Sequence, residues 1–265
     1  MTEHILSLSY GKDSIACLGA IEQLGWPLDR IVHAEVRATD TIPADLPPMV
    51  EFKAKADKII KDRWGIEVEH VCAEMNGERL TYEKVFYRLR SSSKNGNTLH
   101  KMYGWPFQKG PWCNDRLKTG VLDKYVSGCI QYLGIAADEP ERIQRYTKPG
   151  FKLPLVDIGW TEADCRKWCE ENDLLSPIYT TATRGGCWFC HNQGAGQLRL
   201  LRKNYPELWA LMLKWDMDSP VSFKSDGRTV LDYDIRFYME DNGLLNPQKR
   251  FLWKYVDEYK ENMND

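Results

Sequence analysis

The residues best suited to chemistry near the start of the chain form the run S-Y-G-K-D-S at residues 9–14. This run lies between a predicted strand and a predicted helix. Gly11 would let the backbone turn tightly toward a ligand. The amides of the first helical turn, with the Ser9 and Ser14 hydroxyls and the Lys12 ammonium, could then hold a phosphate. The alternative is a plain strand–turn–helix connection, because the run lacks the spacing of a Walker loop.

A second candidate is the acidic turn formed by Asp138 and Glu139, which follows the run G-I-A-A at residues 134–137. An apolar stretch precedes it, so we expect it at the carboxyl edge of a sheet, where open α/β folds bind ligands. Carboxylate oxygens there could hold Mg²⁺ or contact a nucleotide. Taken alone, the turn is better explained as an acidic strand ending.

A third candidate is the C-x-x-C pair formed by Cys187 and Cys190 in a glycine-rich turn. Two thiolates at this spacing can bind one metal, but two ligands do not close a site. His191 directly follows and could add a nitrogen ligand. The alternative is that these cysteines are buried thiols. Cys165 and Cys169 share one face of a predicted helix, and we interpret them as core residues.

A basic stretch covers residues 84–118, with eight Lys or Arg against one acid. Aromatic residues alternate with these cations, which suits phosphates and stacked bases. Ser91–Asn97 predicts a flexible turn within it. The phosphates of a nucleotide and the backbone of a nucleic acid would both satisfy such a stretch, and a solvated basic loop is the alternative.

The elements that would position these residues alternate between strands and helices in the first half of the chain. Helical periodicity predicts helices over 13–24 and around 49–64. Apolar or alternating runs predict strands over 4–9, 31–36, 66–72 and 129–135. This alternation predicts an α/β fold with a mostly parallel sheet and helices on both faces.

The second half of the chain has a helical pattern. Thr161 precedes two acids and predicts the N-cap of a helix. The pattern predicts helices over 161–172, 195–216 and 229–242. We therefore divide the chain into an α/β nucleotide-binding domain over 1–180 and a region over 181–265 that holds the C-x-x-C turn and the C-terminal helices.

The composition is that of an ordinary globular protein, with 265 residues, 43% hydrophobic and 28% charged. The net charge of -2 argues against a protein coated in positive charge, although a local patch stays compatible with it. Eight cysteines are too few for a disulfide scaffold. No apolar run is long enough for a membrane span, and the first residues are too polar for a secretory signal. We expect a cytoplasmic protein.

Five motifs together resemble the phosphoadenosine phosphosulfate (PAPS) reductase family of the PP-loop ATP pyrophosphatases. The run at 9–14 looks like the PP-loop of that superfamily. The other matching segments are W-C-N-D-R-L-K at 112–118, G-I-A-A-D-E at 134–139, P-L-V with W-T-E-A-D within 154–164, and R-G-G-C-W-F-C at 184–190. The resemblance covers roughly residues 4–195. It implies an adenine nucleotide alpha hydrolase-like, Rossmann-like fold.

The resemblance also implies site residues and cofactors. The expected cofactors are ATP or a related adenine nucleotide, with Mg²⁺. We assign catalytic roles to Lys12, Asp13 and Asp138. The predicted nucleotide-binding residues are Ser9, Tyr10, Gly11, Lys12, Asp13, Ser14, Asp40, Lys118, Gly134, Asp138, Glu139, Arg142 and Arg145.

The family also places a cysteine at the position of Cys113, which gives a third thiolate beside Cys187 and Cys190. Three thiolates suggest a [4Fe–4S] cluster with one open iron, which we favour, or a zinc site completed by His191.

Two departures from the reductases guide the functional prediction. The first loop keeps Lys12, Asp13 and Ser14, as relatives that cleave ATP do. The reductases use a cysteine near the C-terminus as nucleophile, but no cysteine follows Cys190 here. We therefore expect an enzyme that adenylates an acceptor with release of pyrophosphate, and that could couple this step to sulfur transfer.

Two alternatives to this prediction remain open. One is a thiol-dependent sulfonucleotide reductase, and the other is a non-catalytic nucleotide-binding module that acts with a partner. The sequence leaves the acceptor open between a nucleic acid and a small molecule. It also leaves open whether the protein forms a homodimer or binds another protein.

Overall fold

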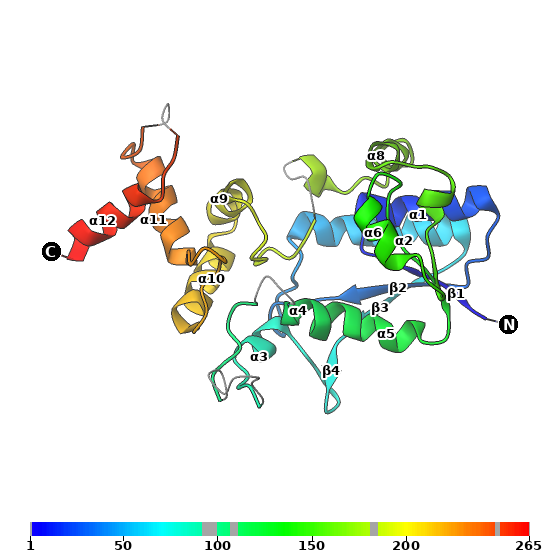
Figure 1. Cartoon of the computed structure of the whole chain (residues 1–265), viewed down its shortest axis with the longest axis horizontal. Coiled ribbons are helices and arrows are strands. Elements are labelled where there is room, and N and C mark those ends of the chain that lie inside the picture. Colours follow the sequence, from blue (N-terminus) through cyan, green and yellow to red (C-terminus); the bar gives the residue numbers. More distant parts are fainter. Residues whose placement is uncertain (1, 92–99, 107–110, 181–184, 247–249, 265) are drawn as a thin grey trace. The chain divides into compact units, whose positions relative to one another are not determined.

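The computed structural model divides the chain into two compact units (Figure 1). The first unit holds Met1–Glu83 and Trp112–Cys187, and the second holds Lys84–Pro111 and Trp188–Asp265. The structure describes residues 2–91, 100–106, 111–180, 185–246 and 250–264. Arg184 and residues 92–97 of the predicted flexible turn lie outside these ranges.

A five-stranded sheet organises the first unit, in the order β3-β2-β1-β6-β7. Its neighbouring strands all pair in parallel. The strands are β1 (His4–Ser7), β2 (Arg30–Glu35), β3 (Val68–Cys72), β6 (Ile130–Tyr132) and β7 (Phe151–Lys152). The prediction of a mostly parallel α/β sheet is confirmed. The sequence did not predict β7, because two residues carry no periodicity.

Helices cover both faces of this sheet. Figure 1 shows α1 (Lys12–Leu24) and α2 (Pro47–Trp64) on one face and α5 (Gly120–Val126) on the other. Helix α2 contacts β3, and α5 contacts β2 and β3. The remaining elements of this part of the chain are β4 (Glu74–Met75), β5 (Glu78–Arg79), α3 (Tyr82–Phe86), α4 (Trp112–Asn114), the π-helix η1 (Asp115–Thr119), α6 (Pro140–Tyr146), α7 (Pro154–Asp157), α8 (Glu162–Glu171) and the 3-10 helix η2 (Pro177–Thr180).

Helix α1 ends at Leu24, where its sequence predicts, and begins one residue earlier than predicted, at Lys12. Gly25 ends it with a positive φ of 63°, a conformation that glycine adopts without steric cost. The buried face of α1 packs against α8, which Thr161 begins with a capping box. The thiols of Cys165 and Cys169 are fully buried beside α1, so their interpretation as core residues is confirmed. Burial raises the pKa of both thiols.

The second unit is helical, with α9 (Ala195–Asn204), α10 (Pro206–Asp218), α11 (Val230–Asp241) and α12 (Lys254–Asn264). The prediction that residues 195–216 are mostly helical is confirmed, with a break at Tyr205 that separates α9 from α10. Pro206 disfavours the helical conformation of the residue before it, and Tyr205 has a φ of -138°. The predicted helix over 229–242 is α11, which Thr229 caps.

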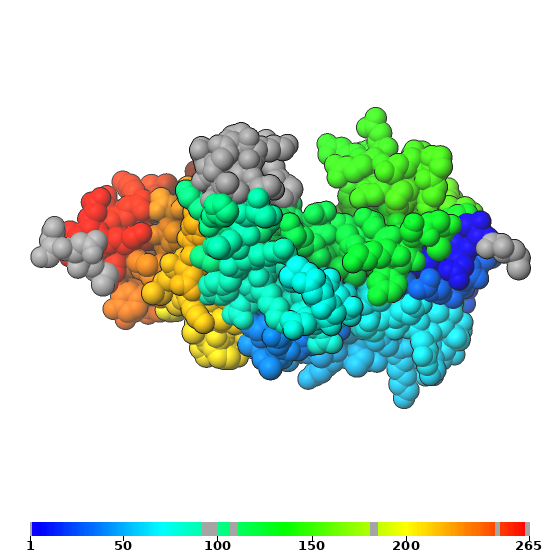
Figure 2. Space-filling view, turned by 90° about the horizontal axis from the view of Figure 1, so that it is seen from below, coloured from blue at the N-terminus to red at the C-terminus, as the bar shows by residue number. Residues whose placement is uncertain are grey.

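The segment Lys84–Pro111 has its contacts in the second unit, whereas the sequence-based division kept it in the 1–180 domain. Trp105 is fully buried, and its ring packs edge-on against Trp215 and Phe223. Its indole N–H donates to Asp216 at 3.0 Å. Aromatic burial therefore joins this segment to α10, which lies far away in the sequence. In the space-filling view of Figure 2 its teal residues reach the surface.

None of the helices in the described ranges combines the length and the apolar character that a membrane span requires.

The contact between α1 and α8 supports a stability prediction at Gly19. A Cβ atom there would lie 2.4 Å from the Trp168 ring. We expect Gly19→Ala to lower the free energy of unfolding by about 1–3 kcal/mol, because the ring must move out of a packed contact. Urea denaturation measures this change. The same substitution in a Trp168→Leu background should cost less than half as much, and an equal cost in both backgrounds would contradict the packing.

Candidate functional site

A cavity of about 410 Å³ lies in the first unit, at the carboxyl ends of β1 and β2. The strand order reverses at β1, which has β2 on one side and β6 on the other. Loops leave such a reversal in opposite directions, so a crevice opens at this edge of the sheet. The sequence-predicted site residues that line the cavity are Ser9, Tyr10, Gly11, Asp13, Ser14, Lys118, Gly134, Arg142 and Cys187.

The loop after β1 is held closed by its own serines. The Ser14 hydroxyl accepts from the Ser9 N–H at 3.1 Å and donates to the Gly11 carbonyl at 3.0 Å. The Ser9 hydroxyl lies 2.9 Å from that of Ser14. Gly11 is the N-cap of α1 and makes no side-chain cap. The first turn of α1 therefore depends on groups from outside the helix to satisfy its amides.

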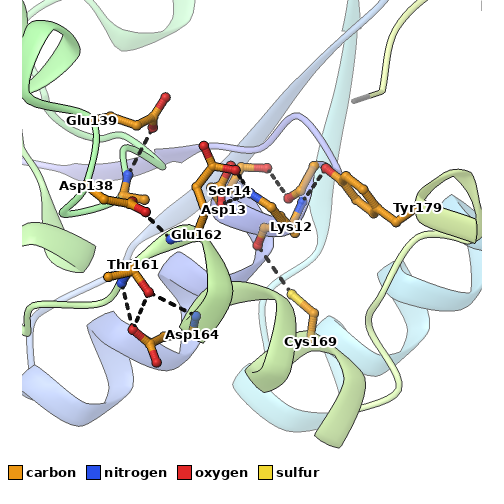
Figure 3. Close-up of polar contacts among 12 residues, drawn as sticks. Lys12, Asp13, Ser14, Asp138, Glu139, Thr161, Glu162, Asp164, Cys169 and Tyr179 are labelled. Carbon is orange, nitrogen blue, oxygen red and sulfur yellow. Dashed lines mark hydrogen bonds and ion pairs between the residues drawn. The ribbon is translucent and has the colours of Figure 1, made fainter. Parts of the chain in front are cut away.

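Tyr179 provides one of these outside groups. Its hydroxyl accepts from the Lys12 backbone N–H at 3.1 Å, and the residue lines the cavity (Figure 3). Burial raises the pKa of Tyr179, so the hydroxyl stays protonated. The phenol oxygen thus takes the hydrogen bond that a phosphate oxygen would accept at a helix N-terminus. The sequence analysis did not single out Tyr179.

The Lys12 ammonium lies between two carboxylates. It donates to Asp13 and to Glu162, each at 2.7 Å (Figure 3). Burial works to lower the pKa of Lys12, but these two ion pairs outweigh it and raise the pKa, so the side chain stays cationic. Lys12 is not one of the described residues that line the cavity. Its predicted role toward phosphate requires the side chain to leave these pairs.

Asp13 is the carboxylate of the loop that lines the cavity. Burial raises its pKa, and the neighbouring charges of Glu162 and Glu139 raise it further, although the ion pair with Lys12 works in the opposite direction. Asp13 is therefore more easily protonated than an exposed aspartate. This makes it a candidate proton acceptor at the edge of the cavity.

The side chains of Asp138 and Glu139 accept hydrogen bonds from backbone N–H groups. Neither residue is among the described residues that line the cavity. Asp138 accepts from the Glu162 N–H at 3.0 Å, and Glu139 accepts from the Ala136 N–H at 3.1 Å (Figure 3). Arg142 donates to Glu139 at 2.6 Å. The acidic turn therefore joins the start of α6 to the start of α8. A direct catalytic role for Asp138 stays a prediction.

Gly134 brings the turn after β6 against the start of α1. A Cβ atom at this position would lie 2.6 Å from both the Cα and the N atom of Ser14. These are backbone atoms, so no side-chain rotation could relieve the overlap. Gly134 therefore fixes the distance between this turn and the loop after β1.

The remaining predicted nucleotide-binding residues divide between the cavity and the surface. Lys118 lies in the π-helix η1 and lines the cavity. Single π turns occur often at functional sites, and this one provided no sequence signal. Asp40 and Arg145 are exposed and are not among the described lining residues.

The cavity wall beside β2 contains polar residues that the sequence analysis missed. Lys53 donates to Asp45 and, at 2.8 Å, to the Nε2 atom of His33. His33 donates through Nδ1 to the Leu8 carbonyl at 2.8 Å. Burial and the Lys53 charge lower the pKa of His33, so its ring is neutral. The position of β2 next to β1 could have indicated that β2 contributes to the cavity wall. Nothing in the sequence indicates that Lys53 contacts His33 of this strand.

Tyr10 has a positive φ of 57°, a conformation that costs a non-glycine residue roughly 1–2 kcal/mol. Its ring is buried, and its hydroxyl donates to Asp57 and lies 3.1 Å from the Nε2 atom of His70. These contacts hold the strained backbone of the loop in place. Tyr10 is among the residues that line the cavity, and its hydroxyl is bonded to Asp57.

The predicted metal ligands are divided between the two units. Cys113 and Cys187 belong to the first unit, and Cys190 and His191 belong to the second. Within the described part of the chain, no three His, Cys, Asp or Glu side chains are arranged to hold a metal ion. The Lys224 ammonium donates to the carbonyls of His191 and Gln193, each at 2.5 Å, and so fixes the turn after Cys190. The [4Fe–4S] or zinc site stays a prediction.

Comparison with known proteins gives one distant relative. No family model matches the chain. The uncharacterized nin region protein ORF290 of Escherichia phage lambda is 30% identical over 159 residues. The match covers 54% of this chain and 53% of that protein, so the chain spans about half the length of this relative. The likeness indicates distant homology.

The metal prediction can be tested on anaerobically purified protein. We expect bound iron with acid-labile sulfide, or bound zinc, measured by elemental analysis. Cys187→Ser and Cys190→Ser should each remove more than half of the metal, because a site of few ligands does not tolerate the loss of a thiolate. Cys129→Ser is the matched control and should leave the metal content unchanged. A metal-free wild-type protein would exclude the resident site.

Proposed function

We propose that this protein binds ATP in the cavity of the first unit and transfers the adenylyl group to an acceptor, releasing pyrophosphate. The observation that carries the proposal is the cavity at the switch point of the sheet, where the start of α1 meets the turn at Gly134. Its volume of about 410 Å³ lies within the range of small-molecule sites.

The charges of the cavity suit a polyphosphate. Three cations, Lys53, Lys118 and Arg142, line it beside two carboxylates, Asp13 and Asp45, and the start of α1 adds the positive end of a helix dipole. A bound polyphosphate would compete with Asp45 for Lys53 and with Glu139 for Arg142. A phosphate oxygen could replace the Tyr179 hydroxyl on the Lys12 N–H, exchanging one hydrogen bond for a charge-assisted one. Rotation of the Lys12 side chain toward the anion would add a further cation.

The proposed reaction is a displacement at the α-phosphorus of ATP. An acceptor oxygen forms a bond to this phosphorus, and the bond to the oxygen that bridges the α- and β-phosphates breaks. Pyrophosphate leaves with the electron pair, and the acceptor proton passes to the Asp13 carboxylate or to water. Asp13 suits this role because it lines the cavity and its pKa is raised.

Mg²⁺ fits this site in the way that it fits other nucleotide sites, through one or two carboxylates and the phosphates of the substrate. Asp13 would be the protein ligand, and because a carboxylate that holds Mg²⁺ stays deprotonated, the acceptor proton would then pass to water. The ion would offset the charge that develops on pyrophosphate. The protein's own cations and amides hold the phosphates in place.

One observation favours thiol chemistry as a second candidate. Cys187 lines the cavity, so a thiol lies within reach of a bound nucleotide. This supports either sulfur transfer to the adenylated acceptor or the reduction of a sulfonucleotide. The other buried thiols are poor nucleophiles, because burial raises the pKa of Cys17, Cys165 and Cys169.

ATP binding is tested by calorimetry on Lys12→Ala and Ser14→Ala. We expect each substitution to weaken ATP binding or turnover tenfold to a hundredfold, because a charge-assisted contact contributes about 1.5–3 kcal/mol. Lys167→Ala, on the exposed side of α8, removes the same charge and should leave both unchanged. Melting temperatures separate loss of binding from loss of fold. Unchanged ATP affinity and pyrophosphate release in both loop variants would refute the proposal.

Mass spectrometry distinguishes the proposed reaction from sulfonucleotide reduction. After incubation with PAPS or its unphosphorylated analogue, we expect no sulfite-sized adduct on any cysteine, because the chain has no cysteine after Cys190 to act as the family's nucleophile. The Cys187→Ser variant serves as the background. An adduct on Cys187, with thioredoxin-dependent release of sulfite, would instead favour the reductase.

A further inference from the structure

Two side chains that take no part in the proposed displacement hold Lys12 in the structure. The Glu162 carboxylate accepts from the Lys12 ammonium at 2.7 Å, and the Tyr179 hydroxyl accepts from the Lys12 backbone N–H at 3.1 Å (Figure 3). The ammonium and this N–H are the two groups of Lys12 that a polyphosphate would bind under the proposed function. Glu162 and Tyr179 therefore compete with the substrate for the same two groups.

The chain around Glu162 fixes its position at the start of α8. Its backbone N–H donates to Asp138 at 3.0 Å, and the capping box of Thr161 and Asp164 begins the same helix. The Glu162 side chain is 52% exposed, whereas the Lys12 side chain is 10% exposed. The carboxylate is thus held within reach of a largely buried ammonium, although Glu162 is not among the described residues that line the cavity.

Tyr179 is held from a different direction, by the 3-10 helix η2. This helix contacts α2, and the buried Ser176 just before it donates to the Met49 sulfur of α2 at 2.8 Å. A Cβ atom built at Gly11 would lie 3.5 Å from the Tyr179 hydroxyl. The phenol therefore lies against the turn that begins α1, and its contact with Lys12 is independent of the contact that Glu162 makes.

The same contacts bear on the product of the proposed reaction. Pyrophosphate consists of the phosphates that the start of α1 would hold, and no step of the displacement removes it from these groups. A contact that forms only in the empty site stabilises the empty site, so it weakens the binding of any anion that must replace it. The return of Lys12 to Glu162 and Tyr179 would therefore favour the released state. Product release limits turnover in many enzymes.

We propose that Glu162 and Tyr179 are positioning residues that compete with pyrophosphate for Lys12 and so promote its release. This inference rests on the proposed function of the first unit. Asp13 also pairs with Lys12, at 2.7 Å, but it lines the cavity and has its own role in the displacement. Loss of Glu162 or of the Tyr179 hydroxyl should strengthen the binding of the anion, whereas loss of a phosphate-binding residue would weaken it.

Calorimetry with inorganic pyrophosphate tests the competition. We expect Glu162→Gln to tighten the Kd for pyrophosphate about threefold to fivefold, in the range of a partly exposed ion pair. Tyr179→Phe removes one neutral hydrogen bond and should tighten the Kd about threefold. Titration with ATP should show gains in the same direction. Loss of fold does not produce a gain of affinity, and melting temperatures check that both variants fold.

Two matched controls remove the same chemical groups elsewhere in the first unit. Glu141 is exposed and precedes the cavity residue Arg142, and Tyr125 is exposed on α5. Glu141→Gln should change the Kd for pyrophosphate less than about twofold, because salt screens an exposed charge that does not contact Lys12. Tyr125→Phe should leave the Kd unchanged. Equal tightening by Glu141→Gln and Glu162→Gln would indicate a general effect of charge and would overturn the role of Glu162.

Steady-state kinetics of pyrophosphate release from ATP tests the release step. We expect KM and kcat to fall together by about threefold in Glu162→Gln, because a product that binds more tightly leaves more slowly. A lower KM with an unchanged kcat would overturn the assignment to release.

The outcomes separate this inference from the function on which it rests. Where the wild-type protein binds ATP, unchanged or weaker pyrophosphate binding in one variant would overturn the role of that residue, and in both variants it would overturn the inference alone. A wild-type protein that binds neither ATP nor pyrophosphate would overturn the proposed function, and this inference with it.

Discussion

The close approach of Gly134 to the first turn of α1 is the constraint on which the candidate site depends. β1 and β6 are parallel neighbours, so the chain leaves both at the same edge of the sheet. A side chain at Gly134 would overlap the backbone of Ser14, and the two loops would have to separate. Because glycine keeps them together, the amides of α1, the serine hydroxyls and the Asp13 carboxylate border one cavity. The chemistry proposed for the first unit follows from this single steric condition.

The loop after β1 satisfies its polar groups internally in the structure. Tyr179 accepts from the Lys12 N–H, and the Lys12 ammonium is paired with Asp13 and Glu162. An incoming phosphate would therefore have to displace hydrogen bonds and ion pairs that already exist, because these groups are already satisfied. The gain from binding is a difference between two sets of hydrogen bonds, which is smaller than either set. The site then favours anions whose charge is large enough to compete with the carboxylates beside Lys12. A triphosphate meets this condition better than a monophosphate.

The features that could be predicted from the sequence are those that depend on residues close together along the chain. The parallel sheet, the cap at Gly25 and the loop at residues 9–14 follow from periodicity and from glycine and serine chemistry, and the structure confirms the sheet and the cap. Features created by packing between distant segments were missed. Nothing local pairs Lys53 with His33 or brings Tyr179 to Lys12. Trp105 joins the second unit through contacts more than a hundred residues away, which no periodicity reveals.

The charges of the chain are distributed unevenly between its two units. The first unit holds 19 Lys or Arg against 26 Asp or Glu, so its surface disfavours a long polyanion. The cations Lys53, Lys118 and Arg142 line its cavity, where a small anion would compete with Asp45 and Glu139 for two of them. The segment Lys84–Pro111 of the second unit has the opposite character, with six Lys or Arg and no acid. The near-zero net charge of the whole chain is therefore no guide to the charge of either unit.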